Sequence, residues 1–158
     1  GSATLPESVW RFDPATEKFA EFARLATGRV GHVAVALSDD RVLVYGGERS
    51  AIEAPMAEIL DTRTRTARAT LGRPNAPSRR YAAGVLLADG RVLIVGGATL
   101  GGAQPVAELF DPVTEQFTPV PGGLASARYA HTATRLRDGR VLVYGGHGAT
   151  GGTGPVLP

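Results

Sequence analysis

Cysteine is absent from the 158 residues, and lysine occurs once, at Lys18. Without thiols the chain can form no disulfide and offers no thiolate metal ligand, so the sequence does not indicate a redox compartment. Apolar runs are short and stop at paired glycines, and none approaches the roughly eighteen residues that predict a membrane span. The bias of the basic residues toward arginine, with many alanines and glycines, indicates a GC-rich genome and therefore a bacterial protein.

The charge pattern also excludes some partners. The net charge is only +2, and the basic residues are spread along the chain. A nucleic-acid site needs a clustered basic stripe with aromatic residues between the charges, so none is predicted. The opening GSATLPES has no basic segment followed by an apolar core, so we expect no export signal there, and Gly1 and Ser2 are typical of a cloning remnant. Residues 1–6 are expected to be a linker, and the cellular location is left open.

A repeated heptapeptide is the most informative feature that is present. The segment RVLVYGG occupies residues 41–47 and returns unchanged at 140–146, and RVLIVGG lies between them at 91–97. The copies are 50 and 49 residues apart. An arginine twelve residues before each copy, and an aspartate in segments such as EILD and ELFD, keep nearly the same period. A fixed period near fifty residues predicts a repeat architecture.

Each repeat contains four segments that suit β-strands. The first, RVGHVAVAL at 29–37, is rich in small and β-branched residues and ends at a tight-turn pair, Asp39 and Asp40. In RVLVYGG the alternating side chains face opposite sides and both sets are apolar, so this strand is expected to be buried on both faces. Asp-Pro turns at 13–16 and 111–114 join the third segment to the fourth. Four antiparallel strands per repeat are typical of a propeller blade.

The repeat resembles the kelch family. The resemblance rests on the glycine pair that ends the second strand and on an aromatic residue six positions after the third-strand aspartate, Phe19 or Phe117. Ala67 takes that position in the middle unit, so weaker packing of its outer strand is expected. The resemblance covers residues 7–147 and implies an all-β, kelch-type β-propeller. The structural repeat positions are Gly46, Gly47, Gly96, Gly97, Gly145, Gly146, Asp13, Asp61 and Asp111.

The units add up to three blades. Closed propellers have about four to eight blades, and in kelch propellers the two chain ends commonly meet in one composite blade. An open arc of three would expose strand edges and apolar faces. We therefore expect a homodimer that forms a six-bladed ring, each chain's last two strands completing the other's first two. The competing interpretation is a portion of a longer propeller. The predicted parts are a half-blade at 7–22, blades at 29–70 and 79–120, a half-blade at 128–146, and a glycine-rich tail at 148–158.

No catalytic residue, metal ligand or cofactor is predicted. The three repeated aspartates fit turns better than paired glycosidase acids, because they belong to different blades. If the first strands line a channel, the arginines that precede them could ring its mouth and attract anions, with the tyrosines beside them. In the alternative, these arginines bridge adjacent blades through carbonyl groups or a carboxylate. The candidate ligand-binding residues are Arg29, Arg79, Arg128, Tyr81, Tyr129, His32 and His131.

The histidines favour structural roles. His32 and His131 occupy equivalent positions, where the middle unit has Ala82, and such repeated placement favours packing over metal binding. His147 lies in the glycine-rich segment HGATGGTG, which lacks the ending of a phosphate-binding loop and fits a solvated loop better.

Two classes of function follow. The first is a non-catalytic module that binds a protein, peptide or glycan on the loop face or channel mouth. The second is an enzyme, or an accessory domain of one, acting on an anionic sugar at that mouth. The kelch resemblance brings in galactose oxidase, whose cysteine-tyrosine cross-link is impossible here, and sialic-acid epimerases. The shortage of polar candidates favours the binding module.

Overall fold

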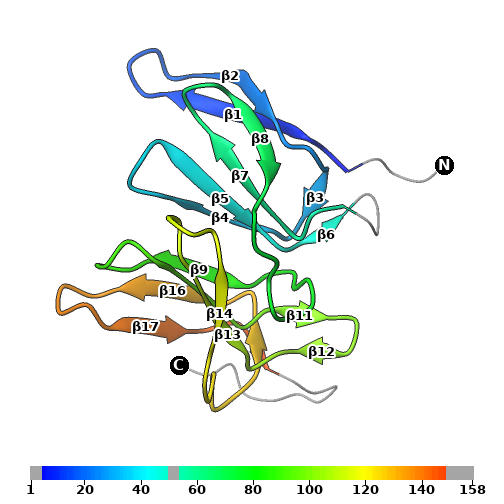
Figure 1. Cartoon of the computed structure of the whole chain (residues 1–158), viewed down its shortest axis with the longest axis vertical. Helices are drawn as coiled ribbons and strands as arrows, with labels where there is room; N and C mark the ends of the chain where they lie inside the picture. The colour runs from blue at the N-terminus through cyan, green and yellow to red at the C-terminus, as the bar shows by residue number, and fades with distance from the viewer. Residues whose placement is uncertain (1–4, 50–53, 149–158) are drawn as a thin grey trace.

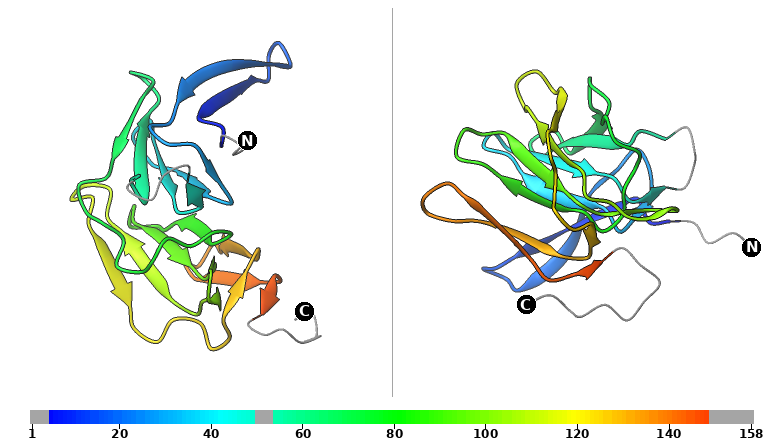
Figure 2. Two further views of the ribbon diagram at one scale, coloured as in Figure 1. Left: turned by 90° about the vertical axis from the view of Figure 1, so that its right-hand side faces the viewer. Right: turned by 90° about the horizontal axis from the view of Figure 1, so that it is seen from below.

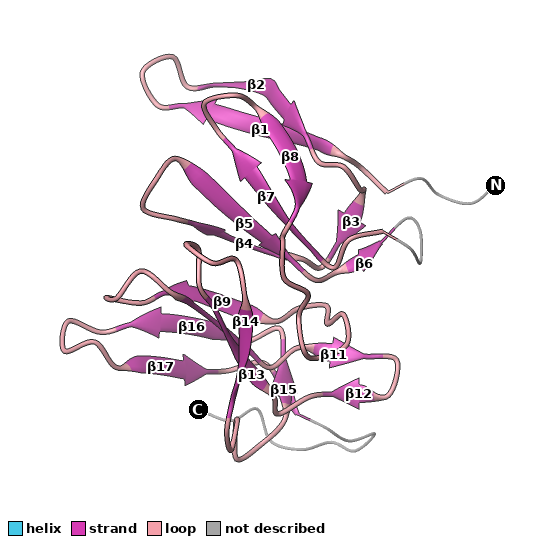
Figure 3. Cartoon of the chain, in the orientation of Figure 1, coloured by secondary structure: helices cyan, strands magenta, loops and turns pink. Residues whose placement is uncertain are grey.

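The chain forms antiparallel β-sheets arranged in a curved row. The computed structural model describes residues 5–49 and 54–148, and this part consists of strands, turns and loops without a helix (Figure 3). The N-terminal and C-terminal hairpins lie at opposite ends of the row (Figures 1 and 2). None of the described segments is a helix long and apolar enough to cross a membrane. The predicted all-β class is confirmed.

Two complete four-stranded sheets occupy the middle of the row. In each sheet the four strands pair in the order in which they occur along the chain. Short extra strands lie between the second and third strands in sequence and belong to separate sheets. Sheet one has the order β4-β5-β7-β8, and sheet two has the order β9-β10-β13-β14. The strands are β4 (Val33–Ala36), β5 (Arg41–Tyr45), β7 (Ala57–Asp61), β8 (Thr66–Ala69), β9 (Ala83–Leu86), β10 (Val92–Val95), β13 (Ala107–Phe110) and β14 (Phe117–Val120).

A two-stranded hairpin lies at each end. The N-terminal hairpin, β1 (Ser8–Asp13) and β2 (Lys18–Arg24), carries the sequence of a third and fourth strand, and β2 contacts β8 of sheet one. The C-terminal hairpin, β16 (Thr132–Arg135) and β17 (Val141–Tyr144), carries the sequence of a first and second strand. β9 contacts both β4 and β16, so the three first strands are neighbours.

The predicted first strand over 29–37 is wrong in one respect, because the structure divides it. β3 (Arg29–Val30) leaves the sheet and pairs with β6 (Glu48–Arg49), while β4 starts only at Val33. Gly31 separates the two pieces with a positive φ of 68°, a conformation that interrupts extended backbone. The last repeat has the same division, with β15 (Arg128–Tyr129) pairing with β18 (His147–Gly148). In the repeat of sheet two the extra strands pair with each other, β11 (Ala98–Thr99) with β12 (Gly102–Ala103).

The main hydrophobic core lies between sheets one and two. The prediction that the second strand is buried on both faces is confirmed for β5, where Leu43, Val44 and Tyr45 are all buried. A buried aliphatic or aromatic side chain contributes about 1.5–3 kcal/mol, so this cluster is the main apolar contribution to stability. Its members from both sheets are Val35, Leu37, Leu43, Tyr45, Ala57, Ile59, Val92, Ile94, Phe110 and Phe117.

The N-terminal hairpin contains a β-bulge. Val9 lies opposite Ala23 whereas Trp10 lies opposite Glu21, so Phe22 has no partner in the ladder. The guanidinium carbon of Arg65, from the turn of sheet one, lies 5.2 Å from the centre of the Phe22 ring. A bulge of this kind redirects one side chain, and here it places an aromatic ring against the neighbouring sheet.

Candidate functional site

The segments that precede the three first strands form a repeated main-chain ladder between units. The amide of Tyr81 donates to the carbonyl of Gly31 at 2.7 Å, and the amide of Ala130 donates to the carbonyl of Tyr81 at 2.8 Å. All three residues have left-handed backbone, with φ of 68°, 57° and 54° along the chain. Because this conformation is unfavourable for tyrosine and alanine, the hydrogen bonds between units must hold it in place.

The glycine pairs complete this ladder. The amide of Gly47 donates to the carbonyl of Arg79 at 2.9 Å, and the amide of Gly97 donates to the carbonyl of Arg128 at 2.8 Å. Gly47 has φ of 82°, and a β-carbon added to it would lie 2.7 Å from the carbonyl oxygen of Val30. The second glycine of the pair is therefore required both by the backbone conformation and by the close approach of the neighbouring strand.

Arg29 and Arg79 point into the protein. Both side chains are fully buried, and each forms an ion pair with a third-strand glutamate, Glu58 for Arg29 and Glu108 for Arg79. Arg29 also donates to the carbonyl oxygens of Gly46 and Pro55, at 2.8 and 3.0 Å. Ligand binding by these two arginines stays a prediction that their burial does not support.

Arg128 has the same position but different surroundings. Its Nη1 donates to the carbonyl of Gly145 at 3.0 Å, as Arg29 does to Gly46. Within residues 5–49 and 54–148, however, it has no carboxylate partner, and its Nε is buried without an acceptor. The third strand that would carry the glutamate is the part that the C-terminal hairpin lacks.

Glu108 joins the two complete sheets. Its Oε1 accepts hydrogen bonds from the Tyr45 hydroxyl at 2.8 Å and from Arg79 at 3.1 Å, and its Oε2 accepts from the amide of Asn75 at 2.6 Å. Burial raises the pKa of Tyr45, so the phenol keeps the proton that it donates. Both oxygens of this buried carboxylate therefore have hydrogen-bond donors, as a buried polar group requires.

A second carboxylate joins the same sheets near the turns. Glu115 is buried at the turn between β13 and β14, and it pairs with Arg68 at 2.5 Å and with Arg41 at 3.3 Å, both from sheet one. The hydrogen bond from Arg68 is the main cause that holds the pKa of Glu115 below its usual value. The sequence did not predict a role for the three buried glutamates, Glu58, Glu108 and Glu115. A signal was present, because Glu58 and Glu108 both stand three residues before a repeated aspartate.

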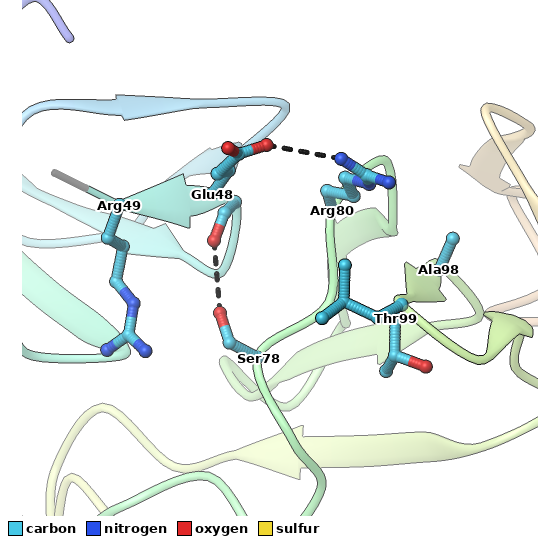
Figure 4. Close-up of a pocket in the computed structure, with 8 residues that line it drawn as sticks. Glu48, Arg49, Ser78, Arg80, Ala98 and Thr99 are labelled. Atoms are coloured by element: carbon cyan, nitrogen blue, oxygen red, sulfur yellow. Dashed lines mark hydrogen bonds and ion pairs between the residues drawn. The ribbon is translucent and has the colours of Figure 1, made fainter. Parts of the chain in front are cut away.

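The loop face, which carries the segments that follow β5 and β10, contains an open pocket between the first two complete repeats. It is lined by the segment Gly47–Arg49 on one side and by Ala98–Leu100 on the other, with Ser78 and Arg80 between them (Figure 4). Arg80 pairs with Glu48 at 3.1 Å, and the Ser78 hydroxyl donates to the carbonyl of Gly47 at 3.0 Å (Figure 4). The pocket thus offers hydrogen-bonding groups of both kinds to a polar ligand.

Aromatic side chains extend this face toward the last repeat. Tyr81 and Tyr129 line an adjoining pocket with Arg80, and their ring centres are 6.4 Å apart. The Tyr129 ring also stacks on His147 at 5.3 Å. Two of the predicted ligand-binding residues, the tyrosines, therefore do lie together on an exposed loop face.

The two equivalent histidines differ in exposure. His32 is exposed, whereas His131 is buried against Gly96 and neither of its ring nitrogens has a hydrogen-bond partner among the described residues. Burial, and secondarily the positive charge of Arg128, lowers the pKa of His131. His131 is therefore neutral at pH 7 and acts as a packing group between sheet two and the C-terminal hairpin.

The repeated aspartates lie in the turns. One carboxylate oxygen of each accepts a main-chain amide two residues later, at 2.9 Å for Asp13 and 2.8 Å for both Asp61 and Asp111. In the described parts of the chain, no three histidine, aspartate or glutamate side chains gather in a group that could hold a metal ion. No family model matches the chain, and no curated protein matches it either.

Proposed function

We propose that the two complete sheets are kelch-type propeller blades and that the protein is a non-catalytic interaction module. The arrangement of sheets carries this proposal. Two four-stranded sheets with the same strand order lie between two hairpins. The N-terminal hairpin has the sequence of a third and fourth strand, and the C-terminal hairpin has that of a first and second strand, so the two are complementary. The neighbouring positions of β4, β9 and β16 suit first strands around a common axis.

In this proposal the protein closes into a ring with a second copy of itself. Among the described residues neither terminal hairpin pairs with a third strand, and both carry exposed apolar side chains, which favours pairing with another chain. Two chains supply six blades, four of them complete and two composite. Such a ring presents the loop-face pocket and its neighbouring tyrosines twice, which suits a scaffold for a protein, peptide or glycan ligand.

Size-exclusion chromatography with light scattering across a dilution series tests this assembly. We expect a species of twice the 16.4 kDa chain mass that persists to low concentration. A well-folded monomer at all concentrations would contradict the closed dimer and leave a protected arc as the functional unit.

An enzyme or accessory domain acting on an anionic sugar is the second candidate. The observation in its favour is that Arg49 and Arg80 line the same open pocket. Titration of N-acetylneuraminate, followed by amide chemical shifts, separates the two candidates. Shifts confined to this pocket, together with conversion of the sugar, would favour the enzyme, and the absence of both would favour the interaction module.

A further inference from the structure

An ion pair between neighbouring repeats is incomplete at the end of the chain. In the complete part, Arg41 at the start of β5 reaches Glu115, which lies in the turn after the third strand of the next repeat, at 3.3 Å. Arg41 also donates to the carbonyl of Pro112 in that turn at 2.8 Å and pairs with Asp39 at 2.6 Å. Sheet one thus places Arg41 against the turn of the repeat that follows it.

Arg91 is the counterpart of Arg41 in sheet two. It forms the same local pair, with Asp89 at 2.7 Å, and its side chain is about half exposed. The repeat that follows it is the C-terminal hairpin, which in the described residues ends at the second strand. The turn that would carry a glutamate for Arg91 therefore has to come from another segment.

Glu17 is the counterpart of Glu115 in the N-terminal hairpin. The segments DPATEKF and DPVTEQF match at this position, and both glutamates have left-handed backbone, with φ of 53° and 55°. Glu17 is exposed, however, because no repeat precedes its hairpin in the described chain. One chain thus displays both members of a pair like that of Arg41 and Glu115, with Arg91 in sheet two and Glu17 in the N-terminal hairpin.

We infer that Glu17 of a second copy binds Arg91, with β1 of that copy paired to β17. The inference rests on the proposed ring. In the complete sheets Val44 pairs with Glu58 and Ile94 pairs with Glu108. The same register places Val143 opposite Trp10 and Val141 opposite Phe12 of the second copy. These aromatic side chains are exposed in the single chain and would be covered by this pairing.

The main-chain ladder between units gives the same direction of assembly. Gly47 donates to Arg79 and Gly97 donates to Arg128, so the third glycine pair places the amide of Gly146 toward the carbonyl of Arg29 of the second copy. Tyr81 and Ala130 each donate a main-chain hydrogen bond to the preceding unit. The amide of Gly31 of the second copy would donate in the same way to the carbonyl of Ala130. The ladder therefore continues across the junction without a change of direction.

Charge reversal at the two positions tests the pair. Glu17→Arg and Arg91→Glu are both changes at exposed side chains, so each variant is expected to fold, which its melting temperature checks. Each variant alone juxtaposes like charges at both junctions, and we expect the dimer dissociation constant to rise about tenfold. A 1:1 mixture of the two variants restores opposite charges at both junctions, so the mixture should dimerise nearly as well as the unaltered protein.

Two control variants make the outcome specific. Arg73→Glu reverses an exposed charge in the loop between sheets one and two and should leave dimerisation unchanged. Arg65→Glu should strengthen it, because Arg65 stands where Glu115 does and faces the position of Arg140 of the second copy. Sedimentation equilibrium measures all of these constants. Recovery in the mixture supports the inference, since only a pair between chains can produce it.

Two results would overturn the inference, and they are distinguishable. A dimer whose dissociation constant is unaffected by either single variant, or not recovered in the mixture, would refute the Arg91 pair and leave the proposed ring intact. An unaltered protein that stays monomeric at all concentrations would refute both the pair and the ring.

Discussion

The identical segments at 41–47 and 140–146 have different surroundings. Leu43 and Tyr45 in β5 are 0% and 1% exposed, whereas the equivalent Leu142 and Tyr144 in β17 are 50% and 46% exposed. β5 lies between β4 and β7 in a complete sheet, while β17 has β16 as its only strand partner in the described chain. The same seven residues therefore carry a pattern for burial on both faces that one end of the chain does not satisfy by itself.

The polar surroundings differ in the same way. The hydroxyl of Tyr45 donates to Glu108 and its ring lies 6.0 Å from that of Phe117. Arg79 pairs with Glu108, whereas the side chain of Arg128 has the carbonyl of Gly145 as its only partner within residues 5–49 and 54–148. The third strand supplies the glutamate, so the absence of that strand removes the ion pair. An apolar edge beside an incompletely paired arginine is a surface that favours association.

The largest difference is expected between Arg79→Leu and Arg128→Leu. Removal of Arg79 leaves Glu108 buried without its ion-pair partner, which costs about 3–5 kcal/mol of unfolding free energy. Arg128→Leu removes a single hydrogen bond to a carbonyl and should cost about 1 kcal/mol. Urea unfolding at low protein concentration, followed by circular dichroism, measures both. Equal losses would contradict the comparison.

Leu43→Ala and Leu142→Ala extend the comparison to packing. Leu43 is fully buried in the core between the sheets, and its truncation should cost about 3 kcal/mol. Leu142 is half exposed in the single chain, so the same change should cost less than about 1 kcal/mol in dilute solution. At concentrations where the proposed dimer would form, the cost of Leu142→Ala should rise toward that of Leu43→Ala. A concentration-independent value would contradict burial of this strand by a second copy.

Tyr45→Phe and Tyr144→Phe isolate one hydroxyl group. Loss of the Tyr45 hydroxyl removes one donor from a buried carboxylate and should lower the unfolding free energy by about 1.5–3 kcal/mol. Tyr144→Phe changes an exposed residue and should stay within about 0.5 kcal/mol. Denaturant midpoints of the two variants provide the measurement, and a larger effect at Tyr144 would reverse the proposed difference.

The pH dependence of stability gives the smallest expected effect. The folded pKa of His131 is lowered, so the unfolded chain binds a proton more readily than the folded protein. The contribution of His131 to stability is therefore fully present above its unfolded pKa of about 6.5. It is lost as the pH falls through the folded pKa. His32 has the same direction of shift. His131→Ala, which copies Ala82 of the middle repeat, should flatten the loss between about pH 6.5 and 5, while Asp and Glu groups titrate below that window. An unchanged slope would refute the role of His131.

Local patterns were sufficient to predict much of the fold. The period is visible in the repeated segments themselves. The tight turns after each first strand and the strand buried on both faces depend on residues that are near one another in the sequence. The break between Val30 and Val33 was missed because the left-handed position is glycine only in the first repeat. Tyr81 and Ala130 reach the same conformation through hydrogen bonds between units. Such contacts join residues about fifty positions apart and leave no local signal.

The candidate site was harder to predict than the fold. The sequence led to two predictions for the repeated arginines, anion binding and contacts to carbonyl groups or a carboxylate of an adjacent unit. Arg29 and Arg79 do pair with carboxylates inside the protein, but these belong to Glu58 and Glu108 of their own repeats. The period of the glutamates was the available signal for this pairing. Apart from Gly47, the residues that line the pocket on the loop face do not repeat, so no pattern in the sequence identifies them.

An engineered disulfide tests the central claim most directly, because the natural chain has no cysteine. In the register of the complete sheets, Leu142 lies opposite Arg11 of the second copy, since Leu43 pairs with Ile59 and Leu93 pairs with Leu109. Within one chain β17 and β1 lie at opposite ends of the molecule (Figure 1). The variant Leu142→Cys/Arg11→Cys should therefore oxidise to a covalent dimer, seen by non-reducing electrophoresis. Leu142→Cys/Trp10→Cys, one residue out of register, places the thiols on opposite faces and should not. A disulfide within a single chain, or equal cross-linking in both variants, would contradict the account.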